Sequence, residues 1–286
     1  MCNGERCVEI LSMSQAISPE EIERDLTFAR AAAAAAGERA MSLRAMERWE
    51  GKTLADVGDQ ACDGYLQGLI LGRYPEDGIL SEETADSPER LAKERAWIVD
   101  PLDGTREYSQ LRADWAVHVA LTVGGECALA AVALPAQGKV IWGVTVEGQE
   151  RHGVDGGGKL SYGDSDAPEK PRVAVSRSHT PPWMETFIDA IGGEATPAGS
   201  VGNKVCMLLS EEADVYVHKI GLKEWDTCAP ETVARALGWH VCKLRGDEHR
   251  YNLADPHNHE LVVCRPAFKD RVLEVLATCG ALEDER

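Results

Sequence analysis

The sequence predicts an α/β fold of the α+β type, and three observations lead to that fold class. Long helical patterns occupy residues 19–49 and 59–73. Apolar runs between residues 115 and 146 predict the strands of an antiparallel meander. From residue 173 onward, predicted strands and helices alternate, and this alternation is typical of a layered α/β half.

The helical stretches are predicted from capping signals and periodicity. Ser18 is followed by Pro19 and two glutamates, which supplies an N-cap, a first-turn proline and acids at the positive end of the helix dipole. In residues 59–73, apolar side chains recur at helical spacing, and turn-forming residues 74–78 end the pattern.

Short apolar runs predict the strands. Residues 79–80 and 96–99 form two runs that lead directly into acidic residues. The meander is expected over residues 115–123, 128–134 and 140–146. Residues 148–168 are rich in glycine and aspartate, so a surface hairpin and a connection between two halves are expected there.

The C-terminal elements define a second half. Strands are expected at residues 173–175 and 213–218, and helices at residues 182–191, 204–211 and 227–237. Gly238 follows the last helix, and a glycine in the left-handed conformation is a common helix terminator. We therefore expect an N-terminal extension over residues 1–18, an N-terminal α+β half over 19–165 and a C-terminal α/β half over 166–286.

Composition excludes several classes of protein. The 286 residues include 30 basic and 48 acidic ones, for a formal charge of −18, whereas a protein that coats DNA or RNA needs a basic surface. A small phosphorylated ligand remains compatible, because a bound cation inverts the local charge. No apolar run approaches the ~20 residues of a membrane span, and the start lacks a signal-peptide pattern. The nine cysteines include no Cys-x-x-Cys pair, which favours reduced thiols and a cytoplasmic protein.

Acidic residues stand at the ends of several predicted elements. They are Asp59 at a helix start, Glu82 and Glu83 after a strand, Asp100 and Asp103 after the next strand, and Asp226 just ahead of a helix. An ordinary acidic turn explains any one of them. Together they favour a site for Mg²⁺, which prefers oxygen ligands.

The segment from Asp100 to Thr105, Asp-Pro-Leu-Asp-Gly-Thr, is the most informative. Two carboxylates three residues apart on a stiff turn can bridge two cations, and the Leu102 carbonyl adds another oxygen. Gly104 allows the backbone to approach a ligand closely. The backbone N–H groups of Gly104 and Thr105 then offer a phosphate site where a short helix begins.

These motifs resemble those of the inositol monophosphatase superfamily. Residues 97–105 resemble its first signature and residues 225–230 its second, while Glu82-Glu83 and Asp59-Gln60 match its other acidic elements. Residues 100–108 and 175–179 are most similar to CysQ-type 3'(2'),5'-bisphosphate nucleotidases. The resemblance implies a layered α-β-α-β-α sandwich of the inositol monophosphatase / fructose-1,6-bisphosphatase type.

The resemblance also implies roles for individual residues. Two or three Mg²⁺ ions would be held by Glu82, Asp100, the Leu102 carbonyl, Asp103, Asp226 and, more loosely, Asp59. Asp59 and Thr105 would orient and activate the attacking water. The expected substrate-binding residues are Gly104, Thr105, Arg106, Ser176, Arg177, Ser200, Lys204, Lys219 and Asp226. Ser178, His179 and Arg250 are weaker candidates, and we expect His118 to be a structural histidine.

Lys219 stands where inositol-specific members have a glutamate, and a cation there suits a second phosphate better than a polyol. We therefore expect a Mg²⁺-dependent phosphatase acting on adenosine 3',5'-bisphosphate or its sulfated analogue, a small phosphorylated metabolite, with neither nucleic acid polymer nor membrane as partner. The chain would be a monomer or homodimer. The alternatives are a phosphatase for inositol 1-phosphate or fructose 1,6-bisphosphate, a non-catalytic metal-dependent nucleotide sensor, and an acidic scaffold.

Overall fold

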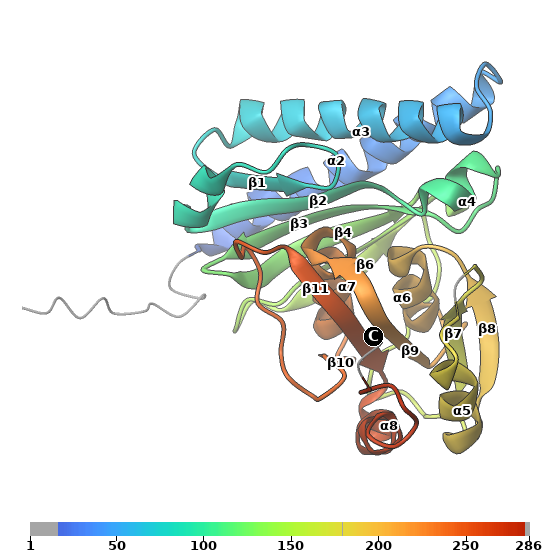
Figure 1. Ribbon diagram of the computed structural model, residues 1–286. Coiled ribbons are helices and arrows are strands. Elements are labelled where there is room, and N and C mark those ends of the chain that lie inside the picture. The colour runs from blue at the N-terminus through green and yellow to red at the C-terminus, as the bar shows by residue number, and fades with distance from the viewer. Residues whose placement is uncertain (1–16, 179, 284–286) are drawn as a thin grey trace, which may run out of the picture.

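The computed structural model describes residues 17–178 and 180–283 (Figure 1). Most of the expected extension, residues 1–18, lies outside the described residues, as do Cys2, Cys7 and the weaker substrate candidate His179. Within the described part of the chain, none of the helices combines the length and apolar character needed to span a bilayer.

The first sheet contains six strands in sequence order. They are β1 (Gly78–Ser81), β2 (Arg95–Asp103), β3 (Ala116–Val123), β4 (Glu126–Leu134), β5 (Lys139–Val144) and β6 (Arg151–Asp155). β1 runs parallel to β2, and every later pair is antiparallel, as the meander predicts. β6 comes from the stretch that was expected to form a hairpin and a connection.

The second sheet contains five strands in the order β10-β11-β9-β7-β8. Their bounds are β7 (Arg172–Ser176), β8 (Glu194–Ala198), β9 (Val215–Lys223), β10 (His240–Cys242) and β11 (His257–Cys264). β7 runs parallel to both β8 and β9, whereas β11 is antiparallel to β9 and β10.

Helices form three layers around the two sheets (Figure 1). α2 (Pro19–Ala45) and α3 (Gly51–Arg73) cover the outer face of the first sheet, and α6 (Val201–Leu209) and α7 (Glu224–Ala236) lie between the sheets. α5 (Trp183–Ala190) and α8 (Lys269–Leu276) cover the outer face of the second sheet. The short α4 (Thr105–Ser109) follows β2. Three hydrophobic cores hold the five layers together, the middle one lying on both sides of the α6–α7 layer, which confirms the expected α-β-α-β-α sandwich.

The first helix begins as its capping signals predict. The Ser18 hydroxyl accepts the Glu21 N–H at 3.3 Å, and the Glu21 carboxylate accepts the Ser18 N–H at 2.9 Å. One face of α2 buries five alanines against the sheet, Ala29, Ala32, Ala33, Ala36 and Ala40. Small side chains allow a helix and a sheet to approach closely, so the alanine run serves packing.

Two helix starts differ from the sequence prediction. α3 begins at Gly51 and not at residue 59, because Leu54 and Ala55 already pack into the core. Asp59 therefore lies inside the helix and not at its start. α7 begins at Glu224, so Asp226 lies in its first turn and not ahead of it.

Candidate metal centre

Three carboxylates from two elements meet between the sheets. Asp100 and Asp103 come from the end of β2, and Asp226 comes from the first turn of α7. One oxygen from each lies within 4.8 Å of the others, and such a group could hold a metal ion. Asp100 is only 1% exposed and Asp103 only 6%. The structure thus brings together residues that the sequence separates by more than a hundred positions.

An irregularity at the end of β2 positions the two aspartates of that strand. β2 pairs with β3 at Asp100 opposite His118 and again at Asp103 opposite Ala116, with a shift of register between. Pro101 lies in the shifted segment, where its lack of an N–H interrupts the ladder. The Asp100 carboxylate accepts the Leu102 N–H at 3.0 Å, which fixes the turn.

Asp226 is held by its own helix. Its carboxylate accepts the backbone N–H of Lys223 at 2.7 Å. This contact links the end of β9 to the first turn of α7. Burial and the charge of Asp103 raise the pKa of Asp226 to about 6.

Asp103 is held from the opposite side by the start of α6. Its carboxylate accepts the Ser200 hydroxyl at 2.5 Å and the N–H groups of Val201 and Gly202 at 3.1 and 2.6 Å. Burial alone would raise the pKa of Asp103, but His118 and Ser200 outweigh it and lower that pKa to about 2. Asp103 is therefore a fixed negative charge.

His118 connects two parts of the centre. Its Nε2 lies 3.2 Å from the Asp103 carboxylate, and its Nδ1 lies 3.0 Å from the Trp225 carbonyl oxygen. A Cβ added at Gly202 would lie 2.1 Å from His118 Nε2, so only glycine fits there. His118 is fully buried, and it is a structural histidine that contacts the centre itself.

Two further acids extend the centre, since Glu82 lies near Asp226 and Asp59 lies near Glu82 and Glu83. Burial, together with the charges of Asp226 and Glu83, raises the pKa of Glu82 to about 7. Burial, together with the charges of Glu83 and Glu82, raises the pKa of Asp59 to about 8. Burial and neighbouring acids also raise the pKa of Asp100 well above its usual range.

Buried carboxylates that repel one another need compensating cations. The ligand atoms in the centre are carboxylate oxygens with one backbone carbonyl nearby, and this donor set suits a hard divalent cation. The residues present therefore fit the metal that the sequence analysis expects.

Thr105 lies between the centre and Asp59. Its hydroxyl is 3.2 Å from the Leu102 carbonyl, to which it donates, and its interaction with the Asp59 carboxylate lowers the pKa of that group against the effect of burial. Gly104 has a left-handed φ of 88°, and a Cβ there would lie 3.0 Å from that of Ser200. Glycine is thus required where β2 turns into α4 beside α6.

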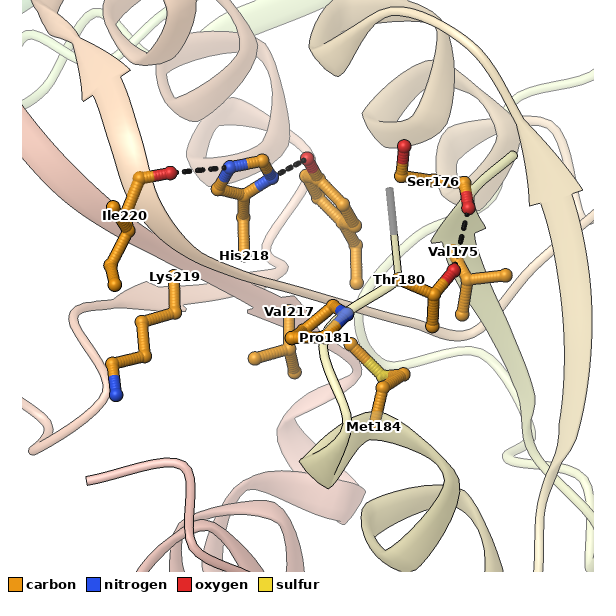
Figure 2. A pocket seen from close by; sticks show the side chains of 10 residues that line it. Val175, Ser176, Thr180, Pro181, Met184, Val217, His218, Lys219 and Ile220 are labelled. Atoms are coloured by element: carbon orange, nitrogen blue, oxygen red, sulfur yellow. Dashed lines mark hydrogen bonds between the residues drawn. The ribbon is translucent and has the colours of Figure 1, made fainter. Parts of the chain in front are cut away.

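A pocket lies beside the C-terminal end of β7 and the middle of β9 (Figure 2). Ser176, Thr180, Met184, Tyr216 and His218 are among its lining residues. The Tyr216 hydroxyl lies 3.0 Å from His218 Nδ1. Burial, together with the charges of Asp103 and Asp226, raises the pKa of Tyr216 well above its usual range, so the charges of the acidic centre act on this pocket residue.

Lys219 also lines this pocket, but its side chain is directed elsewhere. Its ammonium group donates to the Glu283 carbonyl, and Figure 2 shows it pointing away from Ser176 and Thr180.

Ser200 and Lys204 are both buried, and the Lys204 ammonium donates to the Ser200 carbonyl at 2.6 Å. Burial lowers the pKa of Lys204 to about 8.

The remaining basic candidates lie apart from the pocket. Arg177 binds Asp114 at 2.6 Å and lines a separate groove. Arg250 binds Glu126 at 2.5 Å in another depression, and Arg106 is exposed on α4. The structure does not bring these three guanidinium groups together with Ser176.

Sequence reasoning missed Tyr216 and the contacts of His118. His118 stands in a predicted strand of the meander, and pairing that strand with the one before Asp100 would have placed it beside the acidic turn. Tyr216 also lies in a predicted strand, three residues before Lys219. The Lys204 ammonium nitrogen lies 5.2 Å from the centre of the Tyr216 ring, because α6 begins directly after Ser200. The sequence prediction, with that helix starting at Lys204, did not reveal this contact.

Two sheets interleaved with three layers of helices, with an acidic centre between the sheets, define a layered sandwich with a candidate metal site. Residues 21–280 match the inositol monophosphatase family, and the chain belongs to that family.

Curated relatives share a narrower name. The chain is 35% identical over 263 residues to a 3'-phosphoadenosine 5'-phosphate phosphatase of Mycobacterium leprae, covering 88% of this chain and 93% of that one. It is also 34% identical over 208 residues to the human Golgi-resident adenosine 3',5'-bisphosphate 3'-phosphatase, covering 69% of this chain and 55% of that one.

Solved structures share the fold. CysQ from Bacteroides thetaiotaomicron is 27% identical, with a TM-score of 0.69 over 85% of this chain and 97% of that one. An inositol monophosphatase from Anabaena (Nostoc) is 19% identical, with a TM-score of 0.73 over 90% of this chain and 96% of that one. The latter comparison concerns the fold alone.

Proposed function

We propose that this protein is a Mg²⁺-dependent phosphatase that removes the 3'-phosphate of adenosine 3',5'-bisphosphate to give AMP, or acts likewise on its sulfated analogue. The observation that carries the proposal is the convergence of Asp100, Asp103 and Asp226 within 4.8 Å, in a chain 35% identical to a phosphatase named for that substrate. The relatives supply the substrate class, and the acidic centre supplies the chemistry.

The proposed metal ligands are those of the sequence analysis, namely Glu82, Asp100, the Leu102 carbonyl, Asp103, Asp226 and Asp59. When bound, divalent cations neutralise phosphoryl oxygens and lower the pKa of the attacking water. The cluster of raised carboxylate pKa values supports this role, because cations relieve the repulsion that favours protonation. Three donors at the start of α6 and the His118 imidazole already contact the Asp103 carboxylate, so a metal ion would share its oxygens with these groups.

Asp59 is the proposed general base, and Thr105 orients the water. A pKa near 8 in the metal-free protein leaves the Asp59 carboxylate able to exchange a proton near neutral pH. The Thr105 hydroxyl can donate to either Leu102 or Asp59, so it can hold a water between the two. In this proposal, the backbone N–H groups of Gly104 and Thr105 donate hydrogen bonds to the phosphate that leaves the nucleotide.

We assign the nucleoside and its second phosphate to the pocket beside Tyr216. Its lining combines apolar side chains such as Met184 and Val217 with the hydroxyls of Ser176 and Thr180. Such mixed linings suit an adenine ring with a polar edge. Lys219 reaches the second phosphate only if its ammonium group leaves Glu283.

A phosphate-release assay tests the proposal. The purified full chain with Mg²⁺ is offered adenosine 3',5'-bisphosphate, inositol 1-phosphate and fructose 1,6-bisphosphate at equal concentrations. We expect the nucleotide to be preferred at least tenfold in kcat/KM. Preference for either sugar phosphate would refute the substrate assignment, and nucleotide binding without phosphate release would identify a sensor.

The family resemblance adds lithium sensitivity to the proposal. A monovalent cation that enters a carboxylate site in place of Mg²⁺ supplies half its charge and stabilises the phosphoryl oxygens less. We expect millimolar-range LiCl to inhibit phosphate release, with KCl at equal ionic strength as the control. Equal rates of phosphate release in LiCl and KCl would contradict the proposed lithium sensitivity.

A further inference from the structure

Arg90 is a buried arginine outside the acidic centre. It lies in the 3₁₀ turn Pro88–Ala92, within the connection between β1 and β2 that begins at Glu82. Its side chain is only 1% exposed. A buried guanidinium requires hydrogen-bond partners, and those partners define what it does.

Arg90 joins its own connection to a distant turn. Its guanidinium donates to both oxygens of Asp86 at 2.6 and 2.9 Å, to the Asn252 side-chain oxygen at 2.8 Å and to the Leu253 carbonyl at 2.8 Å. The Asn252 side chain donates back to the Arg90 carbonyl at 3.2 Å. The N-terminal half is thereby fastened to residues of the C-terminal half.

The same turn is held from its other side by Glu224. This fully buried carboxylate accepts the N–H groups of Asn252 and Leu253 at 2.6 and 2.8 Å. Glu224 is the first residue of α7, two positions before Asp226. A continuous series of hydrogen bonds therefore runs from the connection that carries Glu82 to the helix turn that carries Asp226.

Glu82 and Asp226 repel each other, since the charge of Asp226 is among the causes that raise the Glu82 pKa. They come from different halves, and no hydrogen bond between their side chains opposes that repulsion. The series through Arg90 links their backbone segments by hydrogen bonds. A planar guanidinium can bind two oxygens on one side and two on the other, which a lysine ammonium cannot do.

We propose that Arg90 is a positioning residue that sets the separation of Glu82 from Asp226, acting through Asn252, Leu253 and Glu224. It touches neither substrate nor metal. This inference rests on the metal binding that the proposed function includes, because the separation of Glu82 from Asp226 matters only if the two carboxylates bind cations together.

Two variants test the inference on the full-length protein. Arg90→Lys keeps the charge but loses the forked geometry. Asn252→Gly suits the left-handed φ of 57° at that position but removes the side-chain contacts to Arg90. Arg245→Lys is the matched control, because Arg245 is exposed and lies outside the series of hydrogen bonds. Amide hydrogen exchange, Mn²⁺ binding by electron paramagnetic resonance, and Mg²⁺-dependent phosphate release are measured for each protein.

We expect about tenfold faster exchange in residues 82–94 and about tenfold weaker Mn²⁺ binding in both variants. The Mg²⁺ concentration for half-maximal rate should rise by the same factor, while kcat at saturating Mg²⁺ stays within about twofold. The control should match the parent protein.

Unchanged Mn²⁺ affinity in folded variants would overturn the inference, whether or not exchange is faster. A lowered kcat with unchanged metal affinity would do the same. Failure of the parent protein itself to bind Mn²⁺ and release phosphate would refute the proposed function and the inference with it. The two failures are distinguishable, because one appears in the variants and the other in the parent.

Discussion

The hydroxyl of Ser200 binds the Asp103 carboxylate at 2.5 Å across 97 residues of sequence. The same hydroxyl accepts the Asn203 N–H at 3.0 Å, so it also caps α6. One side chain therefore begins a buried helix in the C-terminal half and fixes an acid in the N-terminal half. The stability of the sandwich and the geometry of the centre depend on the same atom.

Replacement of Ser200 by alanine should lower both stability and turnover. The variant loses a helix cap and a donor to a buried carboxylate, and together these cost about 1–3 kcal/mol of unfolding free energy. Urea unfolding and phosphate release are measured together. Ser210→Ala, at the other end of α6, is the control and should change neither. Equal stability of the two variants would contradict the role assigned to Ser200.

Replacement of Asp100 by asparagine should separate activity from stability. The amide removes a charge from a buried group of repelling acids, so metal-free stability should stay equal or rise. Turnover should fall by about 100-fold or more, because a charge aimed at the cations is lost. Thermal unfolding in EDTA and phosphate release with Mg²⁺ are the measurements. The exposed Asp164→Asn serves as control, and retained turnover in Asp100→Asn would undo the metal assignment.

The metal-free protein should lose stability as pH rises. The pKa of Asp59 is raised to about 8 in the folded state, so folding favours its protonated form. That contribution is fully present below the unfolded pKa, near 4, and is lost as pH rises through about 8. Unfolding temperatures in EDTA between about pH 5 and pH 9 should fall more steeply for the parent protein than for Asp59→Asn. Parallel curves would show that Asp59 has no such shift.

Mg²⁺ should stabilise the protein more at high pH than at low pH. At about pH 5, protons occupy Asp59 and Glu82, whose pKa values are raised to about 8 and about 7. A cation must displace those protons to bind, so its stabilisation is smaller there. The difference in unfolding temperature with and without Mg²⁺ should therefore increase from about pH 5 to about pH 8. A constant difference would place cation binding elsewhere.

Two glycine variants should change stability in opposite directions. Gly202→Ala places a Cβ 2.1 Å from His118 Nε2 and should cost about 1–3 kcal/mol, because the buried imidazole must move. Gly64→Ala meets nothing within 4 Å in the middle of α3 and should gain about 0.5–1 kcal/mol. Urea unfolding measures both. Equal effects of the two substitutions would mean that His118 is loosely packed.

Local sequence predicted the parts of the centre that lie on one turn. Asp100 and Asp103 follow a buried strand directly, so their placement needs only the strand end and Pro101. The family motif around Asp226 predicted that this residue lies beside Asp100 and Asp103. Its helix begins at Glu224, three residues earlier than predicted. Pro230 lies inside α7, where the surrounding core keeps the helix intact.

Contacts between distant elements could not be predicted in the same way. The start of α6 contains Gly202 and Asn203, which have low helix propensity, so the sequence placed that helix start at residue 204. Hydrogen bonds to Asp103 supply the stabilisation that propensity lacks. Lys204 was assigned from the family resemblance and Lys219 from its charge, but their contacts with Ser200 and Glu283 depend on packing that neither signal contains.

The packing of Gly202 against His118 has a consequence for the evolution of this site. An imidazole at position 118 is compatible only with a residue that lacks a side chain at position 202. Exchange of His118 for a smaller residue would remove this contact and leave room for a side chain at position 202. We therefore expect the two positions to vary together among homologues, with the change at position 118 coming first.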